Sequence, residues 1–225
     1  MEPAPTITVL LVDDEPRFRE GLWTLLKFYN SSSPLAFEVV GEAGRVEEAL
    51  HLAAQWTPNL ILMDMEFPEG NGIHALAGLK QQGYPGRVLV LSAHEEDAWV
   101  FRAMKAGANG YVLKTRIASQ LYAAITTVLS QEIYLPPDLA ARFFRHFHRS
   151  LDGVTPASTD TRLTEREREV LHLLAEGATN ETIARQLHIS IATVKAHLTA
   201  IFEKLKVTSR AQAIVVALRS GLVHP

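Results

Sequence analysis

Acidic, hydroxyl and amino side chains end or follow short apolar runs in the first half of the chain. Asp13 and Asp14 follow ITVLLV, Asp64 ends LILMD, Ser92 ends VLVLS and Lys114 ends GYVLK. Carboxylates held close together repel each other unless a cation lies between them, and oxygen ligands with room for water suit Mg²⁺. With such an ion and an ammonium group present, one aspartate can attack phosphorus and become an acyl phosphate. The residue types therefore predict a divalent-metal site that transfers a phosphoryl group onto the protein itself.

The apolar runs predict an α/β domain that brings these side chains together. The expected strands are residues 7–12, 37–42, 60–64, 88–92 and 110–114, and the expected helices are 16–29, 46–55, 73–82, 95–106 and 117–130. Continuously apolar strands that alternate with amphipathic helices are typical of a doubly wound, five-stranded parallel sheet. Such sheets bind ligands beyond the carboxyl ends of their strands, so all five residues are expected in one cleft. The polar stretch FYNSSSPLAF, residues 28–37, predicts a longer surface loop after the first helix.

Composition and charge favour two domains with different partners. A chain of 225 residues with 47% hydrophobic and 21% charged residues suits two globular cores. The absence of cysteine excludes disulfides, cysteine-ligated zinc and thiol nucleophiles. No signal peptide or membrane-span pattern is visible, so a cytoplasmic location without membrane contact is expected. Residues 160–225 hold nine Lys/Arg against seven Asp/Glu, whereas the remainder is acidic, which favours a polyanion partner for the C-terminal part.

The second half of the chain predicts an all-α domain of four helices. Thr164 and Glu167 have the spacing of a capping box, and Thr179, Ser190 and Ser209 are expected to begin the next three helices. A helix, a tight turn and a second helix with a polar face is the arrangement that enters a DNA major groove. An ordinary helical bundle remains open on spacing alone. We expect a domain at 1–130, a connector helix and linker at 131–161, and the helical domain at 162–225.

The motifs VDDE, LILMDMEFPEGNGI, VLVLSAHE and GYVLKT, in this order, resemble the receiver domains of two-component response regulators. The resemblance implies a flavodoxin-like receiver with Mg²⁺ as cofactor and a sensor histidine kinase as phosphodonor. By resemblance, Asp64 is the phospho-acceptor, Lys114 binds the phosphate, and Ser92 and Tyr111 are the switch residues. The metal would be held by Asp13, Asp14, Asp64 and the backbone carbonyl of Glu66.

The segment after Asp64 departs from the receiver pattern. Phe67 stands where methionine is usual, and Glu69 precedes Gly70 where glycine is usually first. Pro68 and Gly72 keep their places, so the loop geometry is expected to survive. Glu66 adds a carboxylate two residues past the acceptor, which predicts an altered lifetime of the phosphorylated state.

The stretches LTEREREVLHLLAEG, NETIARQLHIS and TVKAHLTAIFEKL resemble the LuxR-type helix-turn-helix domain, and the whole chain resembles the NarL/FixJ subfamily. The resemblance implies a DNA-binding regulator rather than an enzyme, because the receiver catalyses only its own phosphorylation and dephosphorylation. It also implies an active homodimer on two promoter half-sites about 10 bp apart. The residues implied for groove contact are Lys195, Ala196 and Thr199; those for phosphates are Thr193, His197, Lys204 and Arg210; those for dimerisation are Ile214, Ala217 and Leu218.

Three other interpretations fit parts of the sequence. A receiver that is independent of phosphorylation and controlled by a ligand or partner remains an alternative. A phosphatase of the haloacid dehalogenase type is disfavoured because the first strand lacks the DxD motif and no lid is visible. His146 and His148 could bind a metal, but no carboxylate or cysteine adjoins them, and a basic connector helix is favoured.

Overall fold

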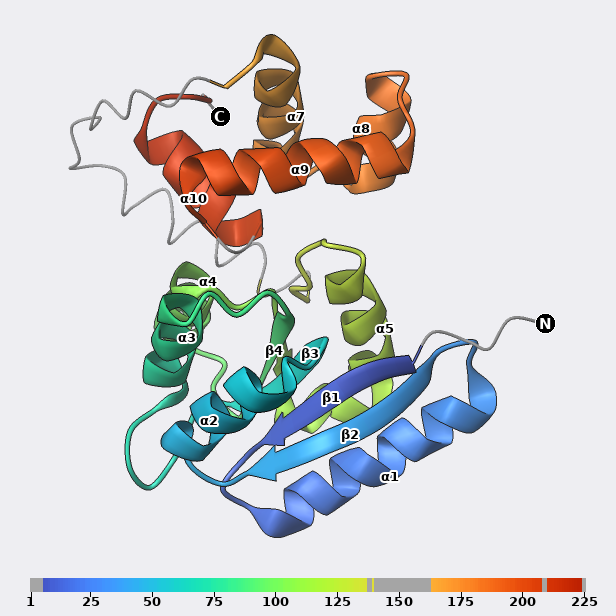
Figure 1. The fold of residues 1–225 in the computed structure, drawn as a ribbon, viewed down its shortest axis with the longest axis vertical. Helices are drawn as coiled ribbons and strands as arrows, with labels where there is room; N and C mark the ends of the chain where they lie inside the picture. Colours follow the sequence, from blue (N-terminus) through green and yellow to red (C-terminus); the bar gives the residue numbers. More distant parts are fainter. Residues whose placement is uncertain (1–5, 137–138, 140–162, 208–209, 224–225) are drawn as a thin grey trace.

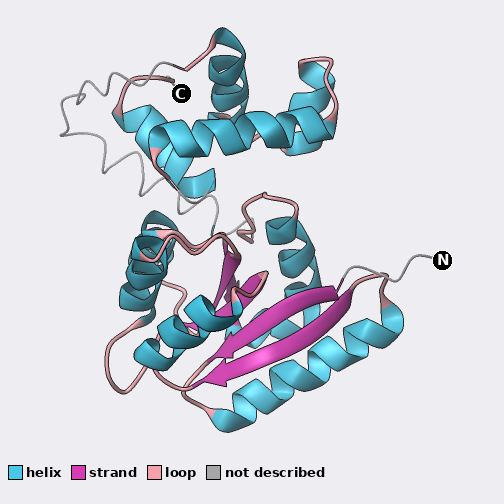
Figure 2. Cartoon of the chain, in the orientation of Figure 1, coloured by secondary structure: helices cyan, strands magenta, loops and turns pink. Residues whose placement is uncertain are grey.

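The structure is a computed structural model that describes residues 6–136, 139, 163–207 and 210–223. A parallel sheet with helices on both faces is followed by a separate group of helices (Figure 2). The connector helix and linker expected at 131–161 lie mostly outside the described residues, as do His146, His148 and Ser209. No helix in the described ranges combines the length and the apolar character that a membrane crossing requires.

The first domain contains a five-stranded parallel sheet, as the alternation of apolar runs predicted. The strands are β1 (Thr6–Val12), β2 (Ala36–Ala43), β3 (Leu60–Asp64), β4 (Arg87–Ser92) and β5 (Gly110–Leu113). Their order in the sheet is β2-β1-β3-β4-β5, so the winding reverses between β1 and β3. Asp13 follows β1 and Asp64 ends β3, which places both aspartates at this reversal.

Five helices cover the two faces of the sheet and bury its strands. They are α1 (Pro16–Ser32), α2 (Val46–Trp56), α3 (Gly72–Gln81), α4 (Asp97–Ala106) and α5 (Ile117–Leu129). Successive strand residues point to opposite faces, so Val9 and Leu11 pack under α1 and α5. Leu10 and Val12 pack under α2, α3 and α4. Burial on both faces explains why these strands are continuously apolar.

The polar stretch after the first helix is not a longer loop, contrary to the sequence prediction. Helix α1 continues to Ser32, so half of that stretch is helical. The hydroxyls of Ser31 and Ser32 donate to carbonyls four residues back. The Asn30 side chain accepts from the Phe37 N–H at 2.7 Å and donates to the Phe37 carbonyl at 2.9 Å. These side chains satisfy the end of the helix and tie it directly to β2.

The second domain contains four helices around a core of its own. They are α7 (Glu165–Ala175), α8 (Asn180–Gln186), α9 (Ile191–Leu205) and α10 (Arg210–Arg219). Thr164 and Glu167 form the predicted capping box, and Thr179 and Ser190 cap α8 and α9 through their side chains. Val170, Leu198 and Ala213 are fully buried in the shared core. Figure 1 shows this domain lying beside the α/β domain, with α10 adjacent to α4.

Candidate functional site

The carboxylates predicted to converge do meet at the carboxyl ends of β1 and β3. Asp13, Asp14 and Asp64 each offer an oxygen within 4.8 Å of the others, and we call this group the acidic pocket. Asp13 and Asp64 are 1% and 5% exposed, whereas Asp14 is open to solvent. Two buried oxygen donors and one exposed donor fit a divalent ion that keeps part of its water shell.

Lys114 completes the acidic pocket from the end of β5. Its Nζ lies 2.8 Å from Oδ2 of Asp13 and 2.8 Å from Oδ2 of Asp64, and 4.3 Å from the centre of the Phe18 ring. Burial alone would lower the pKa of Lys114, but its hydrogen bonds to the two aspartates outweigh burial and raise it. Lys114 is therefore an ammonium ion placed to balance negative charge on Asp64.

Asp64 is held firmly and is harder to ionise than an exposed aspartate. Its Oδ1 accepts the Met65 N–H at 2.6 Å. Burial raises the pKa of the Asp64 carboxyl and the charge of Asp13 adds to this, while Lys114 acts in the opposite direction. A cation beside Asp64 would therefore favour the ionised form that can act as a nucleophile.

Ser92 ends β4, Tyr111 lies on β5, and both side chains are fully buried. The Ser92 Oγ accepts the His94 N–H at 3.1 Å, and the Tyr111 hydroxyl donates to the His94 carbonyl at 2.9 Å. Burial raises the pKa of Tyr111 to about 12, so its hydroxyl stays protonated and serves as a donor. Both side chains thus meet at the backbone of one residue, His94.

His94, in the loop after β4, contacts the loop after β3, and sequence reasoning missed this contact. Its Nε2 lies 2.9 Å from a carboxylate oxygen of Glu66, and its ring stacks on Trp99 with centroids 4.6 Å apart. The motif VLVLSAHE contains His94, but the motif does not reveal that Glu66, from another loop, is its partner. Because of this pair, the extra carboxylate of Glu66 is held toward α4.

The loop after Asp64 brings Gly72 close to the backbone of Asp64 and Met65, despite the unusual sequence of the loop. A Cβ at Gly72 would lie 2.7 Å from the Asp64 carbonyl oxygen and 2.9 Å from the Met65 Cα. Gly72 N–H donates to the Met65 carbonyl at 2.9 Å. Gly72 is therefore required where α3 begins, and Phe67 and Glu69 are accommodated around it.

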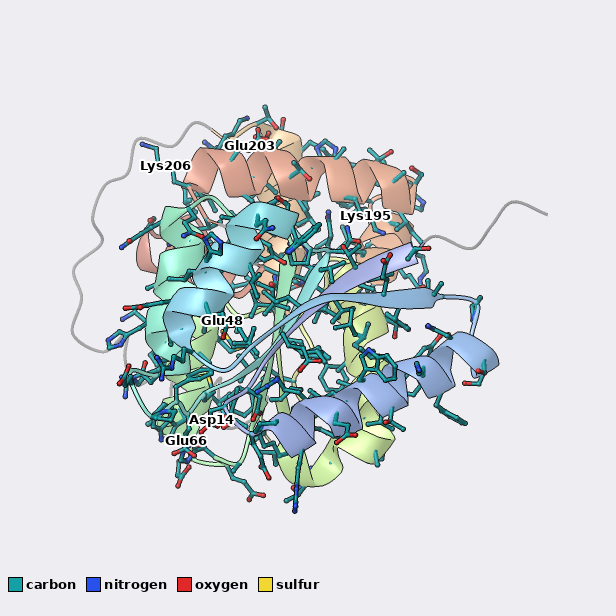
Figure 3. The ribbon with its side chains drawn as sticks, turned by 60° about the horizontal axis from the view of Figure 1, so that its bottom comes forward. Asp14, Glu48, Glu66, Lys195, Glu203 and Lys206 are labelled. Atoms are coloured by element: carbon teal, nitrogen blue, oxygen red, sulfur yellow. The ribbon has the colours of Figure 1, made fainter. Side chains whose placement is uncertain are left out.

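The residues implied for DNA contact differ in accessibility on α9. Thr193, Ala196 and Thr199 are exposed, and Lys195 and His197 are half-buried. Lys195 lines a cavity of about 420 Å³ together with Thr127 of helix α5 in the first domain. Figure 3 shows Asp14 and Glu66 at one end of the first domain, and Lys195 on α9 of the other domain.

Two basic residues implied for phosphate contact have protein partners in this structure. The Lys204 Nζ lies 2.7 and 2.6 Å from the two carboxylate oxygens of Glu167 in the capping box. Arg210 is 6% exposed and donates to the Asn180 side chain at 3.0 Å and to the Ala178 carbonyl. Their roles toward DNA stay predictions, and in this arrangement both stabilise the helical domain.

The residues implied for dimerisation lie on α10. Ile214 and Ala217 are buried in the core of the helical domain, and Leu218 is half-buried. Their contacts are thus within the domain in this arrangement, and their role in a dimer stays a prediction.

Comparison with known proteins matches both halves of the chain to families. The family "Response regulator receiver domain" matches residues 9–126, and "Bacterial regulatory proteins, luxR family" matches residues 161–217. The nitrate/nitrite response regulator protein NarL of Escherichia coli K12 is 38% identical over 220 residues, which cover 95% of this chain and 94% of NarL.

Two solved structures are also similar. A LuxR-family two-component response regulator from Aurantimonas sp. SI85-9A1 has a TM-score of 0.57 and 32% identity, covering 63% of this chain and 98% of that one. RcsB from Salmonella enterica serovar Typhimurium, bound to promoter DNA with the phosphomimetic BeF₃⁻, shares the fold, with a TM-score of 0.55, 22% identity and coverage of 96% and 98%. The chain belongs to the two-component response regulators of the NarL subfamily, transcription regulators that join a receiver domain to a LuxR-type DNA-binding domain.

Proposed function

We propose that phosphorylation of Asp64 controls DNA binding by the helical domain. The proposal rests on one observation. At the ends of three strands, the Lys114 Nζ lies 2.8 Å from a carboxylate oxygen of Asp13 and 2.8 Å from one of Asp64. A sensor histidine kinase is the expected donor. A promoter with two half-sites is the expected target, which implies action in the cytoplasm.

The phosphoryl transfer proposed for Asp64 is a direct displacement at phosphorus. One Asp64 oxygen forms the new P–O bond while the P–N bond to the kinase histidine breaks and its electron pair returns to the imidazole. Bound Mg²⁺, held by Asp13, Asp14, Asp64 and the Glu66 carbonyl, would neutralise charge on the phosphoryl oxygens. Lys114, already 2.8 Å from Asp64, is placed to bind one of these oxygens.

We propose that Ser92 and Tyr111 transmit the effect of Asp64 phosphorylation away from the acidic pocket. A phosphoryl group on Asp64 offers oxygens to the Ser92 hydroxyl, and the loop that holds His94 then shifts with Ser92. The Tyr111 hydroxyl, which donates to the His94 carbonyl, follows this loop. The equilibrium between the present arrangement and one in which the helical domain is released from the receiver is shifted as a result.

The first test is phosphoryl incorporation. Full-length protein incubated with acetyl phosphate and Mg²⁺ is expected to gain about 80 Da by intact mass spectrometry. The Asp64→Asn variant is expected to gain nothing, and Asp97→Asn, a matched change at the start of α4, is expected to behave as the parent. Incorporation into Asp64→Asn would assign the acceptor to another residue.

The second test separates DNA contact from phosphorylation. Lys195→Ala is expected to weaken promoter binding by about 1–3 kcal/mol in gel shifts, because a groove-facing cation is lost. Its phosphoryl incorporation is expected to equal that of the parent. Unchanged gel shifts would place the groove contact elsewhere on α9.

The alternative is a receiver that a ligand or partner controls without phosphorylation. It shares the fold and the DNA-binding domain but requires no acyl phosphate. Promoter binding that is unchanged by acetyl phosphate and by Asp64→Asn, in a protein that binds DNA specifically, would favour this alternative.

A further inference from the structure

The segment that leaves α5 lies along the outer edge of β5. β5 is the last strand of the sheet, and Tyr134 forms an isolated parallel bridge with Gly110 on its free side. The Tyr111 N–H donates to the Tyr134 carbonyl at 2.9 Å, and the Tyr134 N–H donates to the Asn109 carbonyl at 3.2 Å. The segment therefore covers backbone groups that an edge strand would otherwise leave unpaired.

The fit of this segment to β5 depends on a glycine. A Cβ at Gly110 would lie 3.0 Å from the Tyr134 carbonyl oxygen, 3.0 Å from the Tyr134 Cβ and 2.9 Å from a Leu89 methyl group. Tyr111, the next residue, is the buried switch aromatic. The backbone of a switch residue is thus bonded directly to the segment that leads toward the second domain.

The same segment also holds the start of α8 in the helical domain. The Asn180 N–H donates to a Glu132 carboxylate oxygen at 3.0 Å, and the Asn180 side chain donates to the Ser130 carbonyl at 3.0 Å. Asn180 is 2% exposed, so these bonds form away from water. Ile133 packs against both the receiver core and the helical-domain core.

Arg210, at the start of α10, also bonds to Asn180. It donates to the Asn180 side-chain oxygen at 3.0 Å and to the Ala178 carbonyl. Burial lowers the pKa of Arg210 to about 10, and the charge of Glu132 opposes this, so the guanidinium stays charged at neutral pH. Asn180 consequently joins Glu132 of the segment to α8 and α10 at once.

Helix α9, which carries the residues implied for groove contact, is held less closely by the receiver. Ile191 and Lys195 face α5 across the 420 Å³ cavity. Where α10 meets α4, the Gln212 side chain lies 3.4 Å from the Lys105 carbonyl, which is long for a hydrogen bond. The contacts of Asn180 with Glu132 and Ser130, at 3.0 Å each, are shorter than this one.

We propose that residues 130–135 form an interdomain latch that couples Tyr111 to the helical domain. Glu132 and Ser130 hold α8 in the arrangement described here, and the pairing of Tyr134 with β5 sets the position of Glu132. Displacement of Tyr111 shifts the segment and breaks the bond between Glu132 and Asn180. We call the hold of Glu132 and Ser130 on α8 the holding step, and the effect of Tyr111 displacement on this hold the coupling step. The coupling step rests on the proposed phosphorylation of Asp64, whereas the holding step does not.

The holding step is tested in unphosphorylated, full-length protein. The chain has no cysteine, so Ser119→Cys and Glu203→Cys, at exposed positions in the two domains, provide the only sites for a pair of spin labels. Glu132→Ala is expected to raise the ratio of separated to closed molecules on the order of tenfold in pulsed-EPR distances, because a buried donor loses its charged acceptor. Glu132→Gln is expected to open less, since its amide oxygen still accepts, and Glu38→Ala on β2 is the control. Distances of Glu132→Ala that match the parent, or equal opening by Glu132→Gln, would overturn the latch.

The coupling step is tested with acetyl phosphate and Mg²⁺. Tyr134→Pro removes the N–H that bonds to Asn109 and so weakens the pairing that positions Glu132. The variant is expected to gain the phosphoryl group, to be more open than the parent before phosphorylation, and to change its distances less than the parent when phosphorylated. A Tyr134→Pro variant that changes its distances on phosphorylation as much as the parent would overturn the coupling. A parent that gains no phosphoryl group contradicts the proposed function instead, and leaves the comparison of the Glu132 variants valid.

Discussion

At the scale of single residues, the acidic pocket balances burial against charge. Lys114 bonds to two of its three carboxylates, and Asp14 remains in solvent. Burial nevertheless raises the pKa of Asp64. The pocket is therefore incompletely neutralised by its own residues, and a bound cation would relieve the remaining repulsion.

The raised pKa of Asp64 makes a prediction about stability and pH. Because the folded chain holds this proton more tightly, the stability that Asp64 contributes is fully present below its ordinary pKa of 3.8 and is lost as pH rises through the folded-state pKa. Asp64→Asn is expected to melt at a higher temperature than the parent at about pH 7, with the difference narrowing toward about pH 4. Thermal melts of both proteins without Mg²⁺ measure this. A lower melting temperature for Asp64→Asn at neutral pH would contradict it.

At the scale of elements, the start of α7 is joined to the end of α9. Glu167 caps α7 through Thr164 and also accepts both bonds from Lys204. Burial alone would raise the pKa of Glu167, but Lys204 and Thr164 outweigh it, so the pKa is lowered. Glu167 stabilises the domain above its ordinary pKa of 4.5, and this contribution is lost as pH falls through the lowered folded-state pKa.

Glu167→Ala is expected to destabilise the helical domain by about 2–4 kcal/mol at neutral pH, since both a cap and a buried ion-pair partner are lost. Glu169→Ala, on the same helix but exposed, is expected to cost less than about 1 kcal/mol. Denaturant unfolding followed by circular dichroism compares the two. Equal losses in the two variants would show that the contact with Lys204 contributes nothing.

The features that could be predicted are those that follow from short sequence patterns. Asp13, Asp64 and Lys114 were predicted to meet because each stands at the carboxyl end of an apolar strand, and parallel strands end at one edge. The capping box was readable because Thr164 and Glu167 are three residues apart. The partners of Lys204 and Arg210 could not be predicted, because they lie 37 and 30 residues away in the sequence and no helix or strand periodicity links them. The extension of α1 was missed because it depends on the contact of Asn30 with Phe37.

At the scale of the whole molecule, the receiver and the helical domain each have a core of their own. Ile133 packs against both the receiver core under α2, α3 and α4 and the helical-domain core. Domains joined by interfaces of this kind usually move relative to one another unless the interface is large and apolar. The bonds of Asn180 to Glu132 and Ser130 are therefore expected to contribute to the interdomain arrangement.

Calorimetry of the full chain is expected to show two unfolding transitions. The proposed Mg²⁺ site exists only in the folded receiver, so Mg²⁺ at 100 times its dissociation constant is expected to stabilise the receiver against unfolding by about 2.7 kcal/mol. The helical-domain transition is expected to stay unchanged. Asp13→Asn, which alters a proposed ligand, is expected to reduce the shift, and Glu38→Gln is the control. An equal shift of both transitions, or a single transition, would contradict the separation of the domains.

The close approach of Tyr134 to Gly110 has a genetic consequence. Any side chain at position 110 would push the segment away from β5, although this glycine touches neither the acidic pocket nor the recognition helix. Alleles with Gly110→Ala are therefore expected to loosen the hold of Glu132 on α8 and to encode regulators whose promoter binding depends less on the signal. A selection for such signal-independent mutants would then find Gly110, far from the phosphorylation site.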